Sequence, residues 1–394
     1  MVRVGEAEKI ILAHRFSLST ETVELAAARH RILAETVVSD RDLPPFDRAT
    51  MDGIAISYAE YAAGSRDFII SGTQAAGQPR QTLNGPGQAI EIMTGAPVPI
   101  GADCVVPYED ITLSGKQASV AASVVKNQSV HAQGSDAPKG QVLLTPGLQL
   151  TAADIAVLAS AGQATVLVYR TPSAAVISTG DELVDITETP LAHQIRRSNS
   201  HALAAALADL GCQADLFHLP DEPAALAENL QLILNKYELI ILSGGVSKGK
   251  FDFVPKVLEA AGVKKLFHQV SQRPGKPMWF GHSHTNTVFA LPGNPVSTFM
   301  CFYRYIKPWL LTNLHHPIKS DSAILATDFS FPFPLTYFLQ VKIVMEAGRR
   351  MAYPLAGGGS GDFVNLTGVD GFLELPQEIS EFKQGQAFPF IAFR

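Results

Sequence analysis

The chain has 394 residues, of which 46% are hydrophobic and 17% are charged, so it is globular and long enough for two to four domains of about 100 to 200 residues each. Its formal net charge of −6 comes from 37 acidic and 31 basic residues, and the basic residues are scattered, which argues against nucleic acid as a partner. Charged residues interrupt the N-terminus and no apolar run reaches about 18 residues, so we expect no secretory signal, no membrane segment and a cytoplasmic location.

Two helical patterns are present within residues 4–35, and the second begins at Val23. A further helix is predicted from Thr151, and we expect it to pack back on the first two. Residues 1–45 and 139–170 would then form one discontinuous N-terminal domain of mixed, mainly helical character.

Short strands separated by glycine and proline lie between these two stretches, for example in NGPGQ, TGAPVPIGADCVV and AQGSDAPKG. This spacing predicts a β-rich domain over residues 46–138, inserted into the N-terminal domain. The three cysteines, Cys104, Cys212 and Cys301, form no C-x-x-C pair, so we expect buried apolar side chains rather than disulfides or a zinc site.

Residues 171–317 alternate strictly between apolar strand runs and helical patterns. The strands are AAVIS, ADLFHL, ELIILSG, KLFHQV and NTVFALPG, and the helices begin near Asn199, Glu222, Val254 and Pro295. This alternation predicts a doubly wound, mainly parallel sheet with helices on both faces. Alternating stretches such as FLQVKIVM predict a small β-barrel over residues 318–394. The fold class is therefore multidomain α/β.

In an open α/β sheet, ligands bind beyond the carboxyl ends of the strands. Each predicted strand of residues 171–317 runs into an unusual motif at that edge, in the order TGDEL, PDEP, GGVSKGKFD, QRPGKP and GNPVS. We therefore expect one crevice, to which TGDEL contributes Thr179, Gly180 and Asp181.

A glycine loop follows the third strand and begins at Ser243. Gly244 and Gly245 let backbone N–H groups approach an anion, with Ser247 beside them, so phosphate binding is expected. The spacing fits G-x-x-x-x-G-K, but Phe251 stands where a P-loop needs a magnesium-binding hydroxyl, which excludes an ordinary Walker site. A helix-capping turn is the alternative.

A second anion site is expected in LPGNPVS. Asn294 is a predicted N-cap and Pro295 a first helical residue, so the next N–H groups face the crevice beside Pro292, Gly293 and Ser297. A helix start without any ligand is the alternative.

The RPGKP motif places Arg273 and Lys276 on a rigid turn suited to an oxyanion, with a solvated surface turn as the alternative.

Four carboxylates lie on three loops of the same edge, and they are Asp181, Glu182, Asp221 and Asp252. Beside phosphate loops they would repel the ligand unless a hard cation bridged them, and Mg²⁺ usually takes one or two carboxylates together with substrate phosphates and waters. Any one of the four could instead be a cap or a turn residue.

TGDEL, SGGVSKG, RPGKP and LPGNPVS in that order, preceded by PPFDRATMDG and IMTGAPVP, closely resemble the molybdopterin molybdenumtransferases, the MoeA family that includes the E domain of gephyrin. The resemblance covers nearly the whole chain. It implies a molybdopterin-binding α/β domain and Mg²⁺-dependent insertion of molybdate into adenylylated molybdopterin (molybdopterin-AMP), with release of AMP and the finished molybdenum cofactor. It further implies a homodimer whose active sites combine parts of both subunits, and an adenylyltransferase partner that supplies the substrate.

The resemblance also implies residue roles. Glu182, Asp221 and Asp252 take the positions of acids near the metal and the nucleotide, and Arg273, Lys276 and Ser297 those near molybdate. Asp52 of MDG and Thr94 of TGAP would act across the dimer interface; Asp136 of GSD matches a further family aspartate, and Ser360 of GGGSG a serine near the oxyanion.

The chain departs from the family pattern at three positions. Arg273 and Gln269 stand where the family often has lysines, and Gln340 replaces an arginine that the family directs at the ligand. Either Lys342 substitutes for that arginine, or the affinity for the oxyanion is altered.

Two other functions are open. The first is adenylylation of molybdopterin by ATP, because stand-alone adenylyltransferases share the α/β domain with its GGVS and PGNP loops. The second is a non-enzymatic scaffold of the gephyrin kind.

Overall fold

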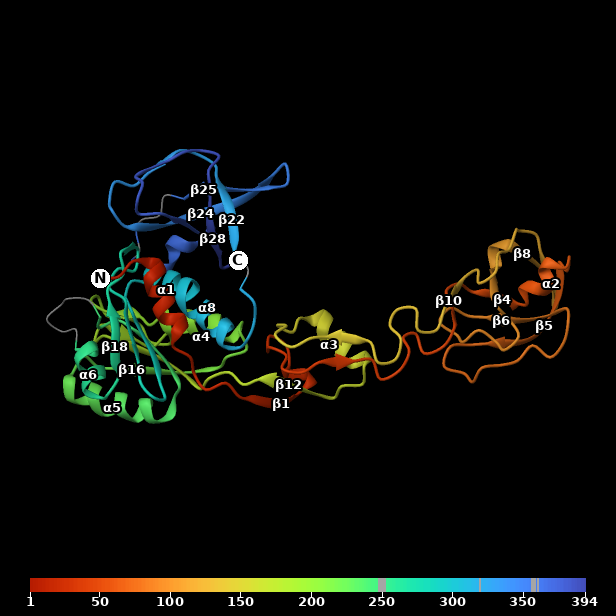
Figure 1. Ribbon diagram of the computed structural model, residues 1–394, viewed down its shortest axis with the longest axis horizontal. Coiled ribbons are helices and arrows are strands. Elements are labelled where there is room, and N and C mark those ends of the chain that lie inside the picture. Colours follow the sequence, from red (N-terminus) through yellow and green to blue (C-terminus); the bar gives the residue numbers. More distant parts are fainter. Residues whose placement is uncertain (247–252, 319, 356–358, 360) are drawn as a thin grey trace. The chain divides into compact units, whose positions relative to one another are not determined.

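The computed structural model describes residues 1–246, 253–318, 320–355, 359 and 361–394 (Figure 1). They form two compact units: unit 1, of residues 1–35, 146–155 and 165–394, and unit 2, of residues 36–145 and 156–164. Within these described ranges, no helix has both the length and the apolar character needed to span a bilayer.

The centre of unit 1 is a six-stranded sheet in the order β16-β13-β17-β21-β20-β18. Its strands are β13 (Ala174–Thr179), β16 (Ala214–Leu219), β17 (Leu239–Ser243), β18 (Lys264–His268), β20 (Trp279–His282) and β21 (Thr287–Leu291). The first four strands in this order are parallel neighbours, which confirms the mainly parallel sheet. Strand β20 was not predicted, and it runs antiparallel to both of its neighbours.

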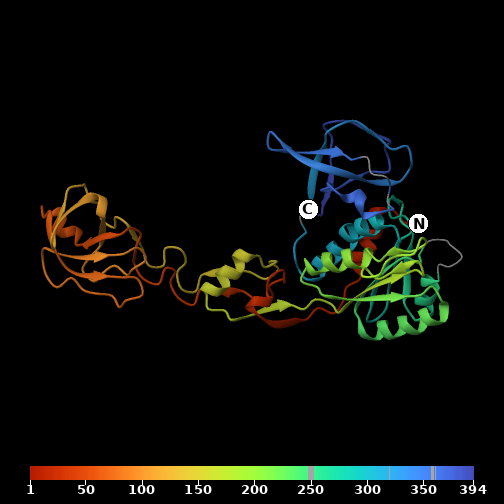
Figure 2. The ribbon, with the colours of Figure 1, turned by 180° about the vertical axis from the view of Figure 1, so that it is seen from behind.

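Helices cover both faces of this sheet, as Figures 1 and 2 show from opposite sides. Val176 and Ile241 pack into one apolar core, whereas Ile177 and Ile240 pack into another, as the two-residue period of a strand requires. The first core contains residues of α1 (Val4–Ala13), α4 (Asn199–Ala208), α7 (Pro295–Cys301), the π-helical segment η3 (Phe302–Ile306) and α8 (Lys307–Asn313). The second contains residues of α5 (Pro223–Lys236) and α6 (Val254–Ala260). The doubly wound architecture is therefore confirmed.

The second helix predicted near the N-terminus was wrong. Residues Thr20–Glu24 form strand β1, which pairs antiparallel with β12 (Thr165–Tyr169), and only a short 3-10 turn, η1 (Leu25–Ala27), follows. The sequence TETVE alternates intermediate and exposed positions and contains β-branched residues, so pairing with a distant strand outweighs the helical spacing.

Unit 2 is built on a six-stranded sheet in the order β7-β4-β6-β5-β9-β8, which confirms the β-rich prediction. Ile54, Phe68 and Val106 are fully buried in its core. The strands are β4 (Gly53–Ile56), β5 (Asp67–Gln74), β6 (Gln88–Ile92), β7 (Cys104–Pro107), β8 (Ile111–Ser114) and β9 (Gln117–Val120), with α2 (Tyr58–Ala62) and η2 (Tyr108–Asp110) between them.

Short strand pairs join segments that are far apart in the sequence. Within unit 2, β2 (Val37–Val38) pairs with β11 (Val142–Leu144), and β3 (Arg48–Ala49) pairs with β10 (Val130–His131). The helix predicted after Thr151 is α3 (Ala152–Ser160). The four domain boundaries expected from the sequence stay a prediction.

The C-terminal residues form the predicted β-barrel. Its closed ring runs β24-β25-β22-β28-β26 and back to β24, around a core that contains Leu339, Val341 and Leu373. The strands are β22 (Asp321–Leu325), β24 (Thr336–Glu346), β25 (Arg349–Pro354), β26 (Gly371–Leu375) and β28 (Ala387–Ala392), with β23 (Phe329–Ser330), β27 (Glu381–Phe382) and η4 (Phe363–Leu366) at its margin. A short strand from the α/β part, β19 (Gln272–Arg273), pairs with β24 and ties the RPGKP turn to the barrel.

Arg304 of η3 joins three segments of unit 1. Its guanidinium donates to the carboxylate of Glu8 in α1 at 2.9 and 3.1 Å and to that of Glu374 in β26 at 2.7 Å, and its side chain is only 12% exposed. Arg304→Met keeps the apolar stem but leaves two carboxylates without a cation. We expect it to lower the free energy of unfolding by about 2 to 4 kcal/mol, measured by chemical denaturation.

Arg350→Met is the matched control, because the Arg350–Asp321 pair lies at 2.8 Å on the surface with side chains 44% and 50% exposed. Such a pair contributes under about 1 kcal/mol. Equal losses in the two variants would contradict the role given to Arg304.

Candidate active site

A cavity of about 750 Å³ opens at the carboxyl ends of the central strands in unit 1. Ser178 of β13, Ser243 of β17 and Leu291 of β21 are in register, so the loops that follow these strands meet at one edge. Thirteen residues proposed from the sequence line this pocket, namely Thr179, Gly180, Glu182, Asp221, Ser243, Gly244, Gly245, Arg273, Lys276, Pro292, Gly293, Asn294 and Ser297.

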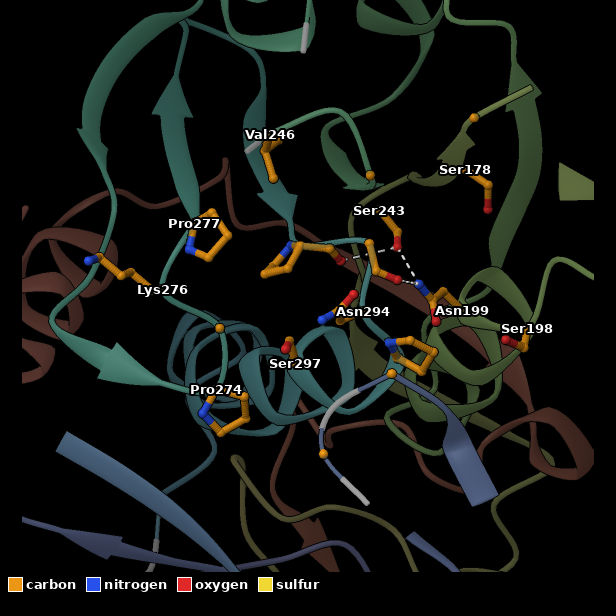
Figure 3. A pocket seen from close by; sticks show the side chains of 18 of the residues that line it. Ser178, Ser198, Asn199, Ser243, Val246, Pro274, Lys276, Pro277, Asn294 and Ser297 are labelled. Atoms are coloured by element: carbon orange, nitrogen blue, oxygen red, sulfur yellow. Dashed lines mark hydrogen bonds between the residues drawn. The ribbon is translucent and has the colours of Figure 1, made fainter. Parts of the chain in front are cut away.

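Asn199, the first residue of α4, ties two of these loops together (Figure 3). Its side-chain Nδ2 donates to Ser243 Oγ at 2.7 Å and to the backbone oxygen of Gly293 at 2.8 Å. The start of α4, the glycine loop and the loop before α7 therefore share one set of hydrogen bonds.

The glycine loop allows no side chain at its first two positions. A Cβ on Gly244 would lie 2.7 Å from the backbone oxygen of Thr179, and one on Gly245 would lie 2.6 Å from Cγ2 of Val254. Both glycines also have positive φ, of +105° and +68°. Packing against Thr179 and Val254 together with the positive φ thus requires glycine at both positions. Ser247 and Asp252 of this loop lie outside the described part of the chain.

The loop before α7 has the expected geometry of a helix start. Asn294 occupies the N-cap position and Pro295 begins the helix. Ser297 is 3% exposed and lines the pocket.

The RPGKP turn is positioned by a buried hydrogen-bond network that the sequence did not reveal. Gln272 is fully buried; its Oε1 accepts from the Tyr305 hydroxyl, and its Nε2 donates to the backbone oxygen of Gly275 at 3.0 Å. Gly275 has φ +88°, and a Cβ there would lie 2.8 Å from Cys301 Sγ. Since Arg273 and Lys276 flank Gly275, this network sets the turn that carries both cations.

Two of the proposed acids, Glu182 and Asp221, line the pocket, whereas Asp181 does not. Asp181 Oδ1 accepts a hydrogen bond from the backbone N–H of Asp221 at 3.2 Å, so its carboxylate stabilises the loop that follows β16. Two carboxylates beside a phosphate loop match the donor set of Mg²⁺. Within the described residues, no group of three or more His, Cys, Asp or Glu side chains could hold a metal ion, so substrate oxygens and waters would have to complete the shell.

Two further cations of the pocket, Arg196 and Arg197, were not predicted from the sequence. They lie at the end of β15 (Ile195–Arg196), which pairs with β14 (Leu183–Val184). Two adjacent arginines just before a predicted helix start were the available signal.

Four polar atoms of the pocket are buried without a hydrogen-bond partner among the described residues. They are Thr179 Oγ1, Arg197 Nε, Asn199 Oδ1 and Gln340 Oε1. Buried polar groups are normally satisfied, so these atoms mark where a polar ligand is expected.

The other proposed residues of the barrel are less informative. Gln340 lines the pocket, whereas Lys342, two residues on along β24, is exposed and does not. Ser360 of the barrel lies outside the described residues, and Gln269, which lies between β18 and β19 of the α/β part, does not line the pocket. A role for Lys342 stays a prediction.

Unit 2 brings its own three candidates into two hydrogen-bonded groups. Asp52 Oδ1 accepts from the backbone N–H and the hydroxyl of Thr94 at 2.6 and 2.7 Å, and these bonds lower the pKa of Asp52. Asp136 Oδ1 lies 2.8 Å from Nε2 of His131, whose Nδ1 accepts from Arg48. The backbone of Ala49 bonds to both Ala96 and Gly95, so the MDG and TGAP motifs lie together.

Comparison with known proteins gives a consistent picture. Residues 2–162 match the MoeA N-terminal region (domain I and II), residues 175–312 a probable molybdopterin binding domain, and residues 322–393 the MoeA C-terminal region (domain IV). The chain is similar to a Synechocystis protein named molybdopterin molybdenumtransferase, with 40% identity over all of both chains, and to a Bacillus subtilis protein of the same name, with 32% identity over all of this chain and 94% of that one. A molybdopterin biosynthesis moeA protein from Pyrococcus horikoshii OT3 superposes over all of both chains with a TM-score of 0.80 at 28% identity.

Loss of the buried network should weaken anion binding at the RPGKP turn. Gln272→Leu leaves the Tyr305 hydroxyl and the Gly275 oxygen unsatisfied, and Tyr305→Phe removes one of the same bonds. We expect both to raise the Kd of a tetrahedral oxyanion such as molybdate by about tenfold, because each lost buried bond costs about 1 to 3 kcal/mol and the turn relaxes. Isothermal titration calorimetry measures this.

Gln231→Leu is the control for general effects of the substitution, since Gln231 is exposed on α5 and bonds only to Asn235 among the described residues. An unchanged Kd in the two network variants, with a lower melting temperature, would show that Gln272 acts on stability alone.

Proposed function

The chain belongs to the MoeA family of molybdopterin molybdenumtransferases, and we propose that it is an enzyme that inserts molybdate into adenylylated molybdopterin with release of AMP and the finished cofactor. The observation that carries this proposal is one pocket that combines a glycine loop, a helix start, a basic turn and two carboxylates. A ligand with phosphates, an oxyanion and a metal would use all four.

The pocket divides the work among its loops. Gly244 donates its own N–H to the backbone oxygen of Leu291 at 3.2 Å, so the N–H groups that follow it in the glycine loop and those at the start of α7 suit the phosphates. Arg273, Lys276 and the buried Ser297 suit molybdate, because guanidinium, ammonium and hydroxyl groups all donate to an oxyanion.

Glu182, Asp221 and Asp252 are the proposed magnesium ligands. Bound Mg²⁺ would supply electrostatic stabilisation of the anhydride and of the leaving AMP. The three carboxylates would hold the Mg²⁺ charge in place and so orient the phosphates. No covalent enzyme intermediate is needed. Thr179, Gly180 and Asp181 shape the same loop, where Glu182 lies so close to Gly180 that a Cβ there would meet Oε2 at 2.6 Å.

We further propose a cytoplasmic homodimer in which Asp52, Thr94 and Asp136 act at the active site of the other subunit, with Ser360 near the oxyanion. The bonds from Thr94 favour ionised Asp52 at neutral pH, as an electrostatic role requires. An adenylyltransferase would supply the substrate.

The direct test incubates the protein with adenylylated molybdopterin, Mg²⁺ and molybdate and follows AMP. AMP that appears only in the presence of molybdate supports the proposal. Consumption of ATP with free molybdopterin would instead identify the adenylylation step. If neither reaction occurs, the scaffold function is the one that remains.

Glu182→Gln should reduce kcat/KM for this reaction by about 100-fold, because it removes a charge that holds the metal without changing the shape of the side chain. The midpoint of the Mg²⁺ titration should move to higher concentration. Glu188→Gln is the matched control: Glu188 is exposed on the same loop, outside the pocket, and among the described residues it accepts a bond through its backbone oxygen, from Arg196, rather than through its carboxylate. Equal activity of Glu182→Gln and the control would remove Glu182 from the site.

A mixing experiment tests whether subunits share active sites. Asp52→Asn and Glu182→Gln should each have only about 1% of the activity when alone. In a mixed dimer, one of the two sites would combine the intact Glu182 of one subunit with the intact Asp52 of the other, so random mixing should restore about a quarter of the activity. No recovery, with subunit exchange verified by mass spectrometry, would place both residues in a site formed by a single chain.

A further inference from the structure

The pocket carries cations on two different walls. Arg273 and Lys276 belong to the turn after β18, which β19 ties to the barrel, whereas Arg196 and Arg197 belong to the segment that leads into α4. In Figure 3, Lys276 and Pro274 lie on one side of the pocket and Ser198 and Asn199 on the other, with Asn294 and Ser297 between them. The cations therefore form two separate groups and not a single cluster at one subsite.

Arg197 is held in place but has bonding capacity left. Its Nη2 pairs with Asp185 Oδ2, and its side chain is 19% exposed. Its Nε is buried and has no hydrogen-bond partner among the described residues. An arginine whose Nη2 is anchored and whose Nε–H is unpaired among the described residues is preorganised for an anionic acceptor.

Asp185 forms a firm anchor. The carboxylate of Asp185 accepts from the backbone N–H of Thr187 at 3.1 Å and from the Thr187 hydroxyl at 2.8 Å. These bonds, together with Arg197, lower the pKa of Asp185. Arg196 differs, because it is exposed and its Nε already donates to the backbone oxygen of Glu188 at 3.1 Å.

The chain neighbours of Arg197 place it beside the glycine loop. Asn199, two residues later, bonds to Ser243 and to Gly293, the residues next to the glycine loop and the α7 start. Asn199 Oδ1 and Thr179 Oγ1, the latter in a residue only 4% exposed, also lack partners among the described residues. A free acceptor, a free hydroxyl and a free cationic N–H together suit a ligand with both hydroxyl donors and an anionic oxygen.

We infer that Arg197 anchors the phosphate of the nucleotide half of the substrate, in a subsite separate from the oxyanion turn of Arg273 and Lys276. The class of ligand is a sugar phosphate such as a nucleoside monophosphate, whose hydroxyls meet Asn199 and Thr179. The inference rests on the proposed function only for the identity of the nucleotide.

The test compares binding of three probes, AMP, adenosine and molybdate, by isothermal titration calorimetry to the full-length protein. Arg197→Gln should raise the Kd of AMP by about 10- to 100-fold, the range expected for a lost charge-assisted bond. The Kd of adenosine, which has no phosphate, and that of molybdate should stay within about twofold. The Kd of AMP for Arg197→Lys should lie between those of Arg197→Gln and wild type, because lysine retains the charge but lacks the planar guanidinium with its several N–H donors.

Two further variants separate loss of the phosphate contact from a general disturbance of the protein. Asp185→Asn keeps Arg197 but loosens its anchor, so it should weaken AMP binding to a smaller extent. Arg350→Gln removes an arginine paired with Asp321 on the surface, outside the pocket, and should leave all three constants unchanged. Retained molybdate binding shows that each variant is folded.

Three results would overturn the inference: unchanged AMP binding in Arg197→Gln, an equal loss for adenosine, or a loss for molybdate alone. Failure of the proposed function is a different result, namely wild-type protein that binds AMP through Arg197 but releases none from adenylylated molybdopterin when molybdate is added.

Discussion

The pocket depends on the side-chain amide of Asn199. Parallel strands end at a common edge, where the backbone groups of the following loops have no ladder partners and must be satisfied in another way. Asn199 satisfies one such group, the backbone oxygen of Gly293, and with the same Nδ2 it donates to the side-chain Oγ of Ser243 at the end of β17. The amide nitrogen thus makes two hydrogen bonds, while the buried oxygen of this pocket-lining residue has no partner among the described residues. The same contact that holds the loops together thus leaves an acceptor for the ligand.

The rest of unit 1 explains why ligand chemistry is confined to this edge. Adjacent residues of β13, such as Val176 and Ile177, are buried in different cores, so neither face of the sheet is open to a ligand. The buried pair Tyr305 and Gln272 extends this rigidity to the RPGKP turn, which would otherwise be a surface loop. Functional groups on loops are precise only when packed elements support them, and here that support comes from a helix, a sheet edge and the barrel together.

The sequence predicted those features that local chemistry determines. Continuous apolar runs marked the five predicted strands of the central sheet, and glycine and proline marked the loops that line the pocket. It missed features that distant contacts determine. Residues Thr20–Glu24 became a strand because Thr165–Tyr169 pairs with them, and β20 was hidden between a Pro-Gly turn and a histidine-rich loop. Gln272 and Arg197 were overlooked because nothing in their immediate sequence shows that Tyr305 or Asp185 fixes their side chains.

Charge separation within the pocket follows from the chain topology. The segment before α4 and the turn after β18 leave opposite parts of the sheet, so their arginines face the cavity from different walls, while Glu182 and Asp221 come from the loops after β13 and β16. A single oxyanion at the turn of Arg273 and Lys276 would leave the buried Nε of Arg197, whose Nη2 pairs with Asp185, without a partner among the described residues. A second anionic group at Arg197 would satisfy this N–H, and a divalent cation between the phosphates and the two carboxylates would offset their charge. The arrangement therefore suits two anionic groups at once, an oxyanion at the turn of Arg273 and Lys276 and a phosphate at Arg197.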